Sequence, residues 1–280
     1  LVAAGRRFRT ASDTEVLLEG YLHWGMPVLE RLAGMFAFAL WDAREQTLLL
    51  VRDRLGVKPL YWGQLADGGL VFASELSAVV ASGLIESRLS LEAASRYLAH
   101  GYVSGNDSIL QGVERLAPAT LLQWRPGSGP MVRSYWDLAS IWRENSLKLC
   151  PDEEVLPRFE EHLDTAVRQR LISDVPLGAF LSGGLDSSTV TGLMLRHLPS
   201  VRTFSVGFEW ESFNELPWAR RVSRELGTEH YEEVLGAVSA DLLVEISGRQ
   251  DEPFADTSIV PTFALCRMAR QHVTVALSGD

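Results

Sequence analysis

The sequence Leu181-Ser182-Gly183-Gly184-Leu185-Asp186-Ser187-Ser188 lies between a predicted strand and a predicted helix. Its two glycines let the backbone approach a ligand closely, its serines add hydroxyl donors, and the free amides at a helix start attract an anion. Asp186 fits an anion site only if a divalent cation lies between its carboxylate and the anion, as Mg²⁺ commonly does. The segment therefore predicts a loop that binds a triphosphate, with Asp186 as a magnesium ligand.

A tight turn capped by an aspartate is the simpler interpretation of a glycine-rich loop, and for a generic loop it deserves about equal weight. The complete sequence of the loop does not match three common nucleotide-binding or nucleophile motifs. The loop lacks the lysine of G-x-x-x-x-G-K-[ST], it is not G-x-G-x-x-G, and Ser182 lies outside the G-x-S-x-G pattern of a nucleophilic serine.

The second half of the chain alternates strand and helix signals, which is typical of a parallel sheet covered by helices. The expected strands are 177–181, 203–208 and 273–277, and the expected helices are 188–198, 215–226 and 257–270. An apolar stripe at helical spacing adds a helix over about 156–171. Pro157 is tolerable there only in the first turn.

The first half is rich in strand signals. Ser12 to Glu15 has the S-x-x-E spacing of a capping box and predicts a helix over 13–24. Strands are expected at 36–41, 48–52, 60–63 and 70–73, followed by a hairpin of 120–124 and 131–135 around a Pro-Gly-Ser-Gly-Pro loop. The polar stretch after Asp137 predicts domains at 1–138 and 153–280, joined by a linker at 139–152.

Composition narrows the class of protein. A net charge of −10 over 280 residues, with scattered basic residues, argues against nucleic acid as a partner. The longest apolar run is far shorter than the roughly 20 residues of a membrane-spanning helix, so we expect no membrane partner. Two cysteines, Cys150 and Cys266, are typical of a reducing cytoplasm. The six histidines show no zinc-binding spacing.

The SGGxDS loop resembles that of the N-type ATP pyrophosphatases, and the first half looks like the glutaminase domain of asparagine synthetases. The residues that carry the likeness are 12–18 (SDTEVLL), 34–42 (GMFAFALWD), 52–61 (RDRLGVKPLY), 72–76 (FASEL), 203–208 (TFSVGF), 251–256 (DEPFAD) and 278–280 (SGD). This likeness implies a partial antiparallel αββα sandwich, the glutaminase or class II glutamine amidotransferase domain. A partial parallel-sheet α/β ATP pyrophosphatase domain would follow it.

Matching the family's motifs residue by residue implies several site residues. Asp13 would hold the α-ammonium of glutamine; its charge is also favourable at a helix start, and both roles can hold together. Asp280 would act in adenylation, and Asp186 would hold Mg²⁺. ATP would contact Leu181, Ser182, Gly183, Gly184, Leu185, Asp186, Ser187, Ser188, Val206, Ser278 and Gly279. Without the resemblance, Leu181 and Val206 would be ordinary core strand residues.

The resemblance implies a cytoplasmic, glutamine-dependent ligase that uses ATP, aspartate and glutamine, and a homodimer is compatible with it. A relative acting on another carboxylate, such as a β-lactam synthetase-like ligase, and a catalytically dead scaffold are the alternatives. The family's N-terminal cysteine nucleophile has no counterpart in these 280 residues. We therefore expect a fragment truncated at both ends and inactive on its own.

Overall fold

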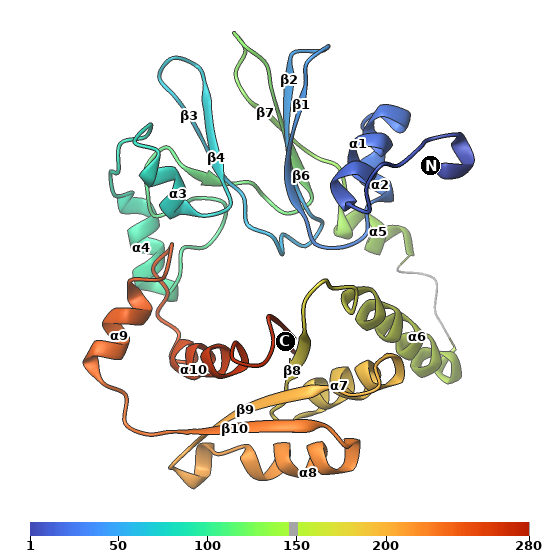
Figure 1. Cartoon of the computed structure of the whole chain (residues 1–280). Helices are drawn as coiled ribbons and strands as arrows, with labels where there is room; N and C mark the ends of the chain where they lie inside the picture. Colours follow the sequence, from blue (N-terminus) through green and yellow to red (C-terminus); the bar gives the residue numbers. More distant parts are fainter. Residues whose placement is uncertain (146–150, 280) are drawn as a thin grey trace. The chain divides into compact units, whose positions relative to one another are not determined.

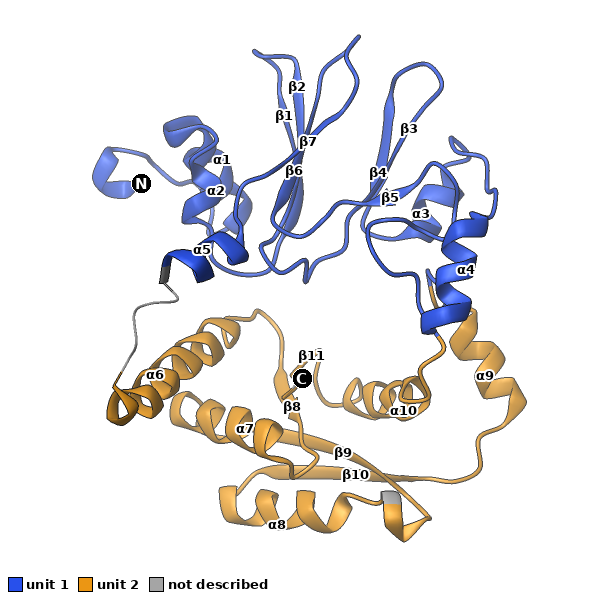
Figure 2. Cartoon of the chain, turned by 180° about the vertical axis from the view of Figure 1, so that it is seen from behind, with its two compact units in different colours: residues 1–147, 251–254 blue, residues 148–250, 255–280 orange. Residues whose placement is uncertain are grey.

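A computed structural model describes residues 1–145 and 151–279 of the chain, which forms two compact units (Figure 2). Unit 1 comprises residues 1–147 and 251–254, and unit 2 comprises residues 148–250 and 255–280. Helix α5 (Leu138–Asn145) occupies the first half of the region predicted as a linker, 139–152. Cys150 lies outside the described residues.

Unit 1 contains two antiparallel sheets, one with the strand order β1-β2-β6-β7 and the other with the order β4-β3-β5. The strands are β1 (Ala37–Asp42), β2 (Thr47–Arg52), β3 (Tyr61–Gln64), β4 (Leu70–Ala73), β5 (Glu114–Arg115), β6 (Thr120–Trp124) and β7 (Met131–Ser134). Besides α5, the helices are a 3₁₀ turn (Val2–Ala4), α1 (Asp13–Trp24), α2 (Val28–Arg31), α3 (Leu76–Ala81) and α4 (Leu91–His100). The predicted hairpin is confirmed, with Thr120 opposite Ser134.

Alternating side chains along the strands build a layered core in unit 1, since successive residues of a strand point to opposite faces. On β2, Leu49 packs into a cluster with Val28 and Leu29 of α2, whereas Leu50 packs with Leu60 next to the second sheet. On the outer side of that sheet, Tyr61 packs against α3. The layers are therefore helix, sheet, sheet and helix, which confirms the αββα expectation.

Unit 2 is built on a parallel sheet with the strand order β10-β9-β8-β11 (Figure 1). The strands are β8 (Leu177–Phe180), β9 (Arg202–Phe208), β10 (Glu229–Leu235) and β11 (Val275–Leu277). The helices are α6 (Asp152–Arg170), α7 (Leu185–His197), a 3₁₀ turn (Glu211–Phe213), α8 (Leu216–Leu226), α9 (Ala240–Ser247) and α10 (Ile259–Ala269). The predicted parallel-sheet α/β class is confirmed.

Helices cover both faces of this sheet. Ala179 of β8 packs with Val167 of α6 and with Leu193 of α7. Its neighbour Phe180 packs on the other face, in a cluster that contains Met268 of α10. The sheet is therefore covered on both faces, which leaves the ends of its strands as the accessible place for a site.

The structure corrects two details of the sequence analysis. Pro157 is the sixth residue of α6 and not a first-turn residue, so this helix runs through a position that lacks an N–H donor. The capping box is only partly formed, because Ser12 accepts from the amide of Thr14 while Glu15 reaches back to the amides of Arg9 and Thr10.

Candidate functional site

The predicted loop lies where the strand order of unit 2 reverses direction. From β8 the chain proceeds to β9 and then β10 on one side, whereas β11 pairs with β8 on the other side. Ligands of open parallel sheets bind at the carboxyl ends of strands at such a switch point. Residues 181–184 follow β8 and Ser278-Gly279 follows β11, so the topology brings two predicted segments to one place.

The loop is held in shape by its own serines. Gly184 is the N-cap residue of α7, and its amide donates to Ser182 Oγ at 3.2 Å. Ser182 Oγ also lies 3.0 Å from Ser187 Oγ, so the two hydroxyls close the turn. The first amides of a helix have no acceptor within the helix, and α7 therefore offers N–H donors directly after the loop.

Two glycines are required by close backbone approach. Gly183 has a φ of +84°, and a Cβ there would lie 2.5 Å from the carbonyl carbon of Trp218 in α8. A Cβ on Gly279 would lie 2.4 Å from the amide nitrogen of Ser187. The turn after β11 thus packs directly against the first turn of α7, and neither glycine has room for a side chain.

A pocket of about 510 Å³ opens beside this loop. Nine of the predicted nucleotide residues line it: Leu181, Ser182, Gly184, Leu185, Asp186, Ser187, Val206, Ser278 and Gly279. Gly183 and Ser188 do not line the pocket; Gly183 packs against α8, and the buried Ser188 hydroxyl has no partner among the described residues. Leu181 is only 1% exposed and forms part of the floor.

The sequence analysis missed a second wall of this pocket. Pro261, Thr262 and Leu265 of α10 line it, together with Phe208 at the end of β9 and Glu215 before α8. The apolar members offer a surface for an aromatic ring. No local motif identifies these residues as part of a pocket. The DEPFAD segment at 251–256, just before α10, is the one nearby stretch that carried the family likeness.

The carboxylate of Asp186 is exposed and lines the pocket, as a magnesium ligand at a phosphate site should. Among residues 1–145 and 151–279, no three acidic, cysteine or histidine side chains gather into a cluster that could hold a metal ion. Mg²⁺ at phosphate sites is commonly bound by one or two carboxylates together with phosphate oxygens, so a single carboxylate fits this ion, and the role of Asp186 as its ligand remains a prediction. Asp280 lies outside the described residues.

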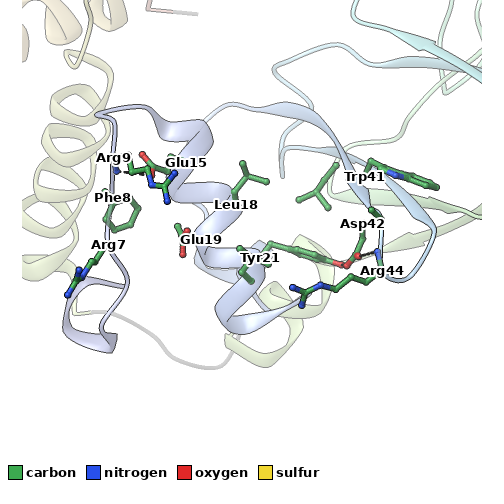
Figure 3. Close-up of a pocket in the computed structure, with 13 residues that line it drawn as sticks. Arg7, Phe8, Arg9, Glu15, Leu18, Glu19, Tyr21, Trp41, Asp42 and Arg44 are labelled. Atoms are coloured by element: carbon green, nitrogen blue, oxygen red, sulfur yellow. Dashed lines mark hydrogen bonds between the residues drawn. The ribbon is translucent and has the colours of Figure 1, made fainter.

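Asp13 is the first residue of α1 and is exposed. Its carboxylate accepts from the neighbouring Thr14 hydroxyl, and the residue does not line the pocket of about 820 Å³ between α1 and β1 (Figure 3). In that pocket, Tyr21 donates to Asp42 at 3.1 Å. A bond from the Thr10 hydroxyl holds the pKa of the Glu15 carboxyl below its usual value. The role of Asp13 thus remains a prediction.

The charged turn at 52–61 is built around a buried carboxylate. Asp53 is 1% exposed and accepts from four backbone amides, those of residues 36, 55, 57 and 58, at 2.9 to 3.3 Å. Burial raises the pKa of Asp53, but the four N–H donors outweigh burial, and the net pKa is lowered. Asp53 thus fixes the conformation of this turn through its four hydrogen bonds.

Cys266 is an exposed free thiol on α10, and partial burial raises its pKa. No helix in the described part of the chain combines the length and the apolar character needed to cross a bilayer.

Comparison with known proteins identifies both units. Residues 1–136 match the family model described as "Glutamine amidotransferase domain", and residues 158–280 match that described as "Asparagine synthase". These matches define the class, a glutamine amidotransferase domain followed by a synthase domain. With relatives matching over almost its whole length, the chain belongs to the glutamine-hydrolysing asparagine synthetase family.

Three relatives illustrate the breadth of the family. A Mycobacterium tuberculosis protein, provisionally named a glutamine-hydrolysing asparagine synthetase, is 38% identical over 99% of this chain and 43% of its own length. Asparagine synthetase (glutamine-hydrolysing) 1 of Bacillus subtilis is 34% identical over 100% of this chain and 43% of its own length. Amidase chyE of Penicillium rubens is 30% identical over the same shares. The chain thus spans less than half the length of these relatives.

Proposed function

We propose that the protein is a glutamine-dependent asparagine synthetase, in which unit 2 of this chain binds ATP and unit 1 belongs to the part that handles glutamine. The observation that carries the proposal is the loop at residues 182–188. It stands at the switch point of the parallel sheet, beside a pocket that Asp186 and the turn at residues 278–279 also line. Such a loop suits a polyphosphate because helix-start amides and hydroxyls supply donors without a lysine.

The reaction we propose has two steps. A side-chain carboxylate oxygen of aspartate attacks the α-phosphorus of ATP, the bond to the β-phosphate oxygen breaks, and pyrophosphate leaves. Ammonia from glutamine then attacks the carbonyl carbon of the β-aspartyl-adenylate, and AMP leaves as asparagine forms and a proton is released. The ammonia comes from hydrolysis of the glutamine side-chain amide, in which water replaces the amide nitrogen and glutamate is the other product.

The residues of unit 2 would act by binding and orientation. We assign the phosphate tail to the loop and the first turn of α7, and the adenine ring to the apolar wall that includes Val206 and Leu265. Asp186 would hold Mg²⁺, which neutralises charge on the phosphates when bound. Holding the α-phosphorus in line with the attacking oxygen is the main contribution that such a site makes.

A second candidate is a ligase of the same frame that acts on a carboxylic acid other than aspartate. The likeness to Amidase chyE favours this candidate, because that protein is named as an amidase and not as an asparagine synthetase although the likeness covers this whole chain.

The experiment that separates these candidates measures pyrophosphate release by the protein at the full length of its relatives, with ATP and a panel of carboxylic acids. Aspartate-dependent release, with asparagine as product when glutamine is added, would support the proposal. Release with another acid but not with aspartate would overturn the substrate assignment and favour the second candidate. No release with any acid would contradict the ligase assignment.

A further inference from the structure

One edge of the four-stranded sheet in unit 1 carries no charge along most of its length. Strand β1 is an end strand of this sheet, and its only strand partner among the described residues is β2. Residues 37–41 of β1 read Ala-Phe-Ala-Leu-Trp. By contrast, β10 at the edge of the unit 2 sheet carries the glutamates Glu229, Glu232 and Glu233. Charges of this kind protect an exposed edge, whose unpaired backbone groups otherwise pair readily with another strand.

The free backbone groups of β1 follow from its pairing with β2. The register is regular from residue 37 to residue 42, and the amide of Asp53 donates to the carbonyl of Phe36 at 2.9 Å. Residues that exchange hydrogen bonds alternate along an antiparallel pair. Residues 38, 40 and 42 therefore bond to β2, whereas the N–H and C=O groups of Ala37, Ala39 and Trp41 point to the free edge. Within residues 1–145 and 151–279, these groups have no hydrogen-bond partner outside the sheet.

These free groups are complementary to those of a second copy of the same strand. They are evenly spaced around Ala39, so two antiparallel copies of β1 related by a two-fold axis can place Ala39 opposite Ala39 of the other copy. In that register Ala37 lies opposite Trp41 of the other copy, and every outward N–H group meets an outward C=O group. An interface with this symmetry closes after two chains and does not extend into a fibre.

The side chains of β1 also fit this register. Ala37, Ala39 and Trp41 point to the same face of the sheet, and Trp41 is 47% exposed and directed away from α1 (Figure 3). The indole ring of Trp41 would cover the small Ala37 of the other copy, which removes apolar surface from water on both chains. The one charged residue of the strand, Asp42, would lie opposite Phe36, so no like charges face each other.

The surface next to this edge is partly apolar and locally balanced in charge. Exposed Leu18 and Leu22 of α1 line the pocket of about 820 Å³ between α1 and β1. Three basic and three acidic residues also line it: Arg7, Arg9, Arg44, Glu15, Glu19 and Asp42. The net charge of −10 of the chain is therefore not concentrated at this edge, and it opposes association there only weakly.

We propose that the β1 edge is a self-association surface, through which two copies of this chain pair β1 with β1 in the antiparallel register centred on Ala39. The two sheets of four strands then form one continuous sheet across the two-fold axis. A single strand pair buries little surface, so the dimer dissociates on dilution. The proposal concerns unit 1 alone and does not depend on the proposed function.

The first measurement is the molar mass of this chain by light scattering over a range of concentrations. The mass should rise from 31.0 kDa toward twice this value as the concentration increases. Ala39→Lys should abolish the rise, because the register brings two like charges directly opposite each other. Ala39 is exposed, so the variant should keep its fold, which circular dichroism checks. Val132→Lys, at an exposed position on the opposite edge strand β7, is the control and should leave the rise unchanged.

A constant mass of 31.0 kDa at every concentration would overturn the proposal. The same holds for a folded Ala39→Lys variant that associates like the unmodified chain.

An equimolar mixture of Ala39→Lys and Ala39→Glu tests the register. Each variant alone should stay monomeric, whereas the mixture should regain the dimer mass because opposite charges then face each other. A mixture that stays monomeric would refute the register centred on Ala39.

Amide hydrogen exchange identifies what covers the edge. The amides of Ala37, Ala39 and Trp41 should exchange several-fold more slowly at high protein concentration than at low concentration, because only the dimer pairs them. Slow exchange that does not depend on concentration would mean that another part of the same chain covers β1. That result would overturn the second copy as the partner.

Discussion

The two adjacent glycines of the phosphate loop should respond very differently to the same substitution. Gly183 has a φ of +84°, which costs a residue with a Cβ about 1 to 2 kcal/mol. The added methyl carbon would also lie 2.5 Å from the Trp218 carbonyl carbon, and relieving an overlap with fixed backbone costs about 1 to 3 kcal/mol. Gly183→Ala should therefore lower the free energy of unfolding of unit 2 by about 2 to 5 kcal/mol.

Gly184→Ala is the matched control, because Gly184 has a φ of −70° and the nearest neighbour of a new Cβ would be Ser182 Oγ at 3.3 Å. The alanine makes a weaker N-cap, which lowers the free energy of unfolding, and a less flexible unfolded chain, which raises it. We therefore expect the free energy of unfolding to change by no more than about 1 kcal/mol. Denaturant titration, followed by hydrogen exchange in β8 and α7, reports on unit 2 specifically. Equal stability of the two variants would refute the argument that α8 and the loop are packed backbone to backbone.

Three further predictions concern single side chains. Asp53→Ala should lower the free energy of unfolding, measured by chemical denaturation, by about 3 to 5 kcal/mol, because four buried amides lose their acceptor. Since the folded pKa of Asp53 is lowered, its ionised form stabilises the fold above the unfolded pKa of about 4, and this stabilisation is lost as the pH falls further. Asp53→Asn should abolish this pH dependence of the free energy of unfolding. Burial raises the pKa of Tyr135 to about 12, and its hydroxyl donates to the Arg52 carbonyl. The stability that this residue contributes should therefore be retained below pH 10 and lost as the pH rises toward 12. In Tyr135→Phe, alkaline titration should show a smaller loss of stability over this range. Asp186→Asn should leave the melting temperature nearly unchanged, because the side chain is exposed, and should remove the magnesium dependence of ATP binding in calorimetry. An unaltered magnesium dependence would contradict the role of Asp186.

The parts of the fold that follow a strong local pattern could be predicted from the sequence. The helix at 13–24 and the strands at 70–73 and 120–124 have the predicted limits, because capping signals and alternation fix them locally. Strand β10 was missed because it is an edge strand rich in charged residues, which protect an exposed edge but hide the strand pattern. The expectation that a helix tolerates Pro157 only in its first turn was wrong, since α6 continues through this residue.

The site was predictable to the extent that one continuous motif carries it. The loop at 182–188 and the turn at 278–279 meet as expected because both follow neighbouring parallel strands. The α10 wall depends on residues that join the loop only in three dimensions. No sequence spacing could show that Leu265 and Asp186 line the same pocket.

The most direct test of the nucleotide site is a crystal structure of this chain with a non-hydrolysable ATP analogue and Mg²⁺. We predict phosphate oxygens about 3 Å from the first amides of α7 and from the Ser182 hydroxyl, with the metal ion bound between Asp186 and the phosphates. A nucleotide bound elsewhere, or a loop left empty at saturating analogue, would contradict the account.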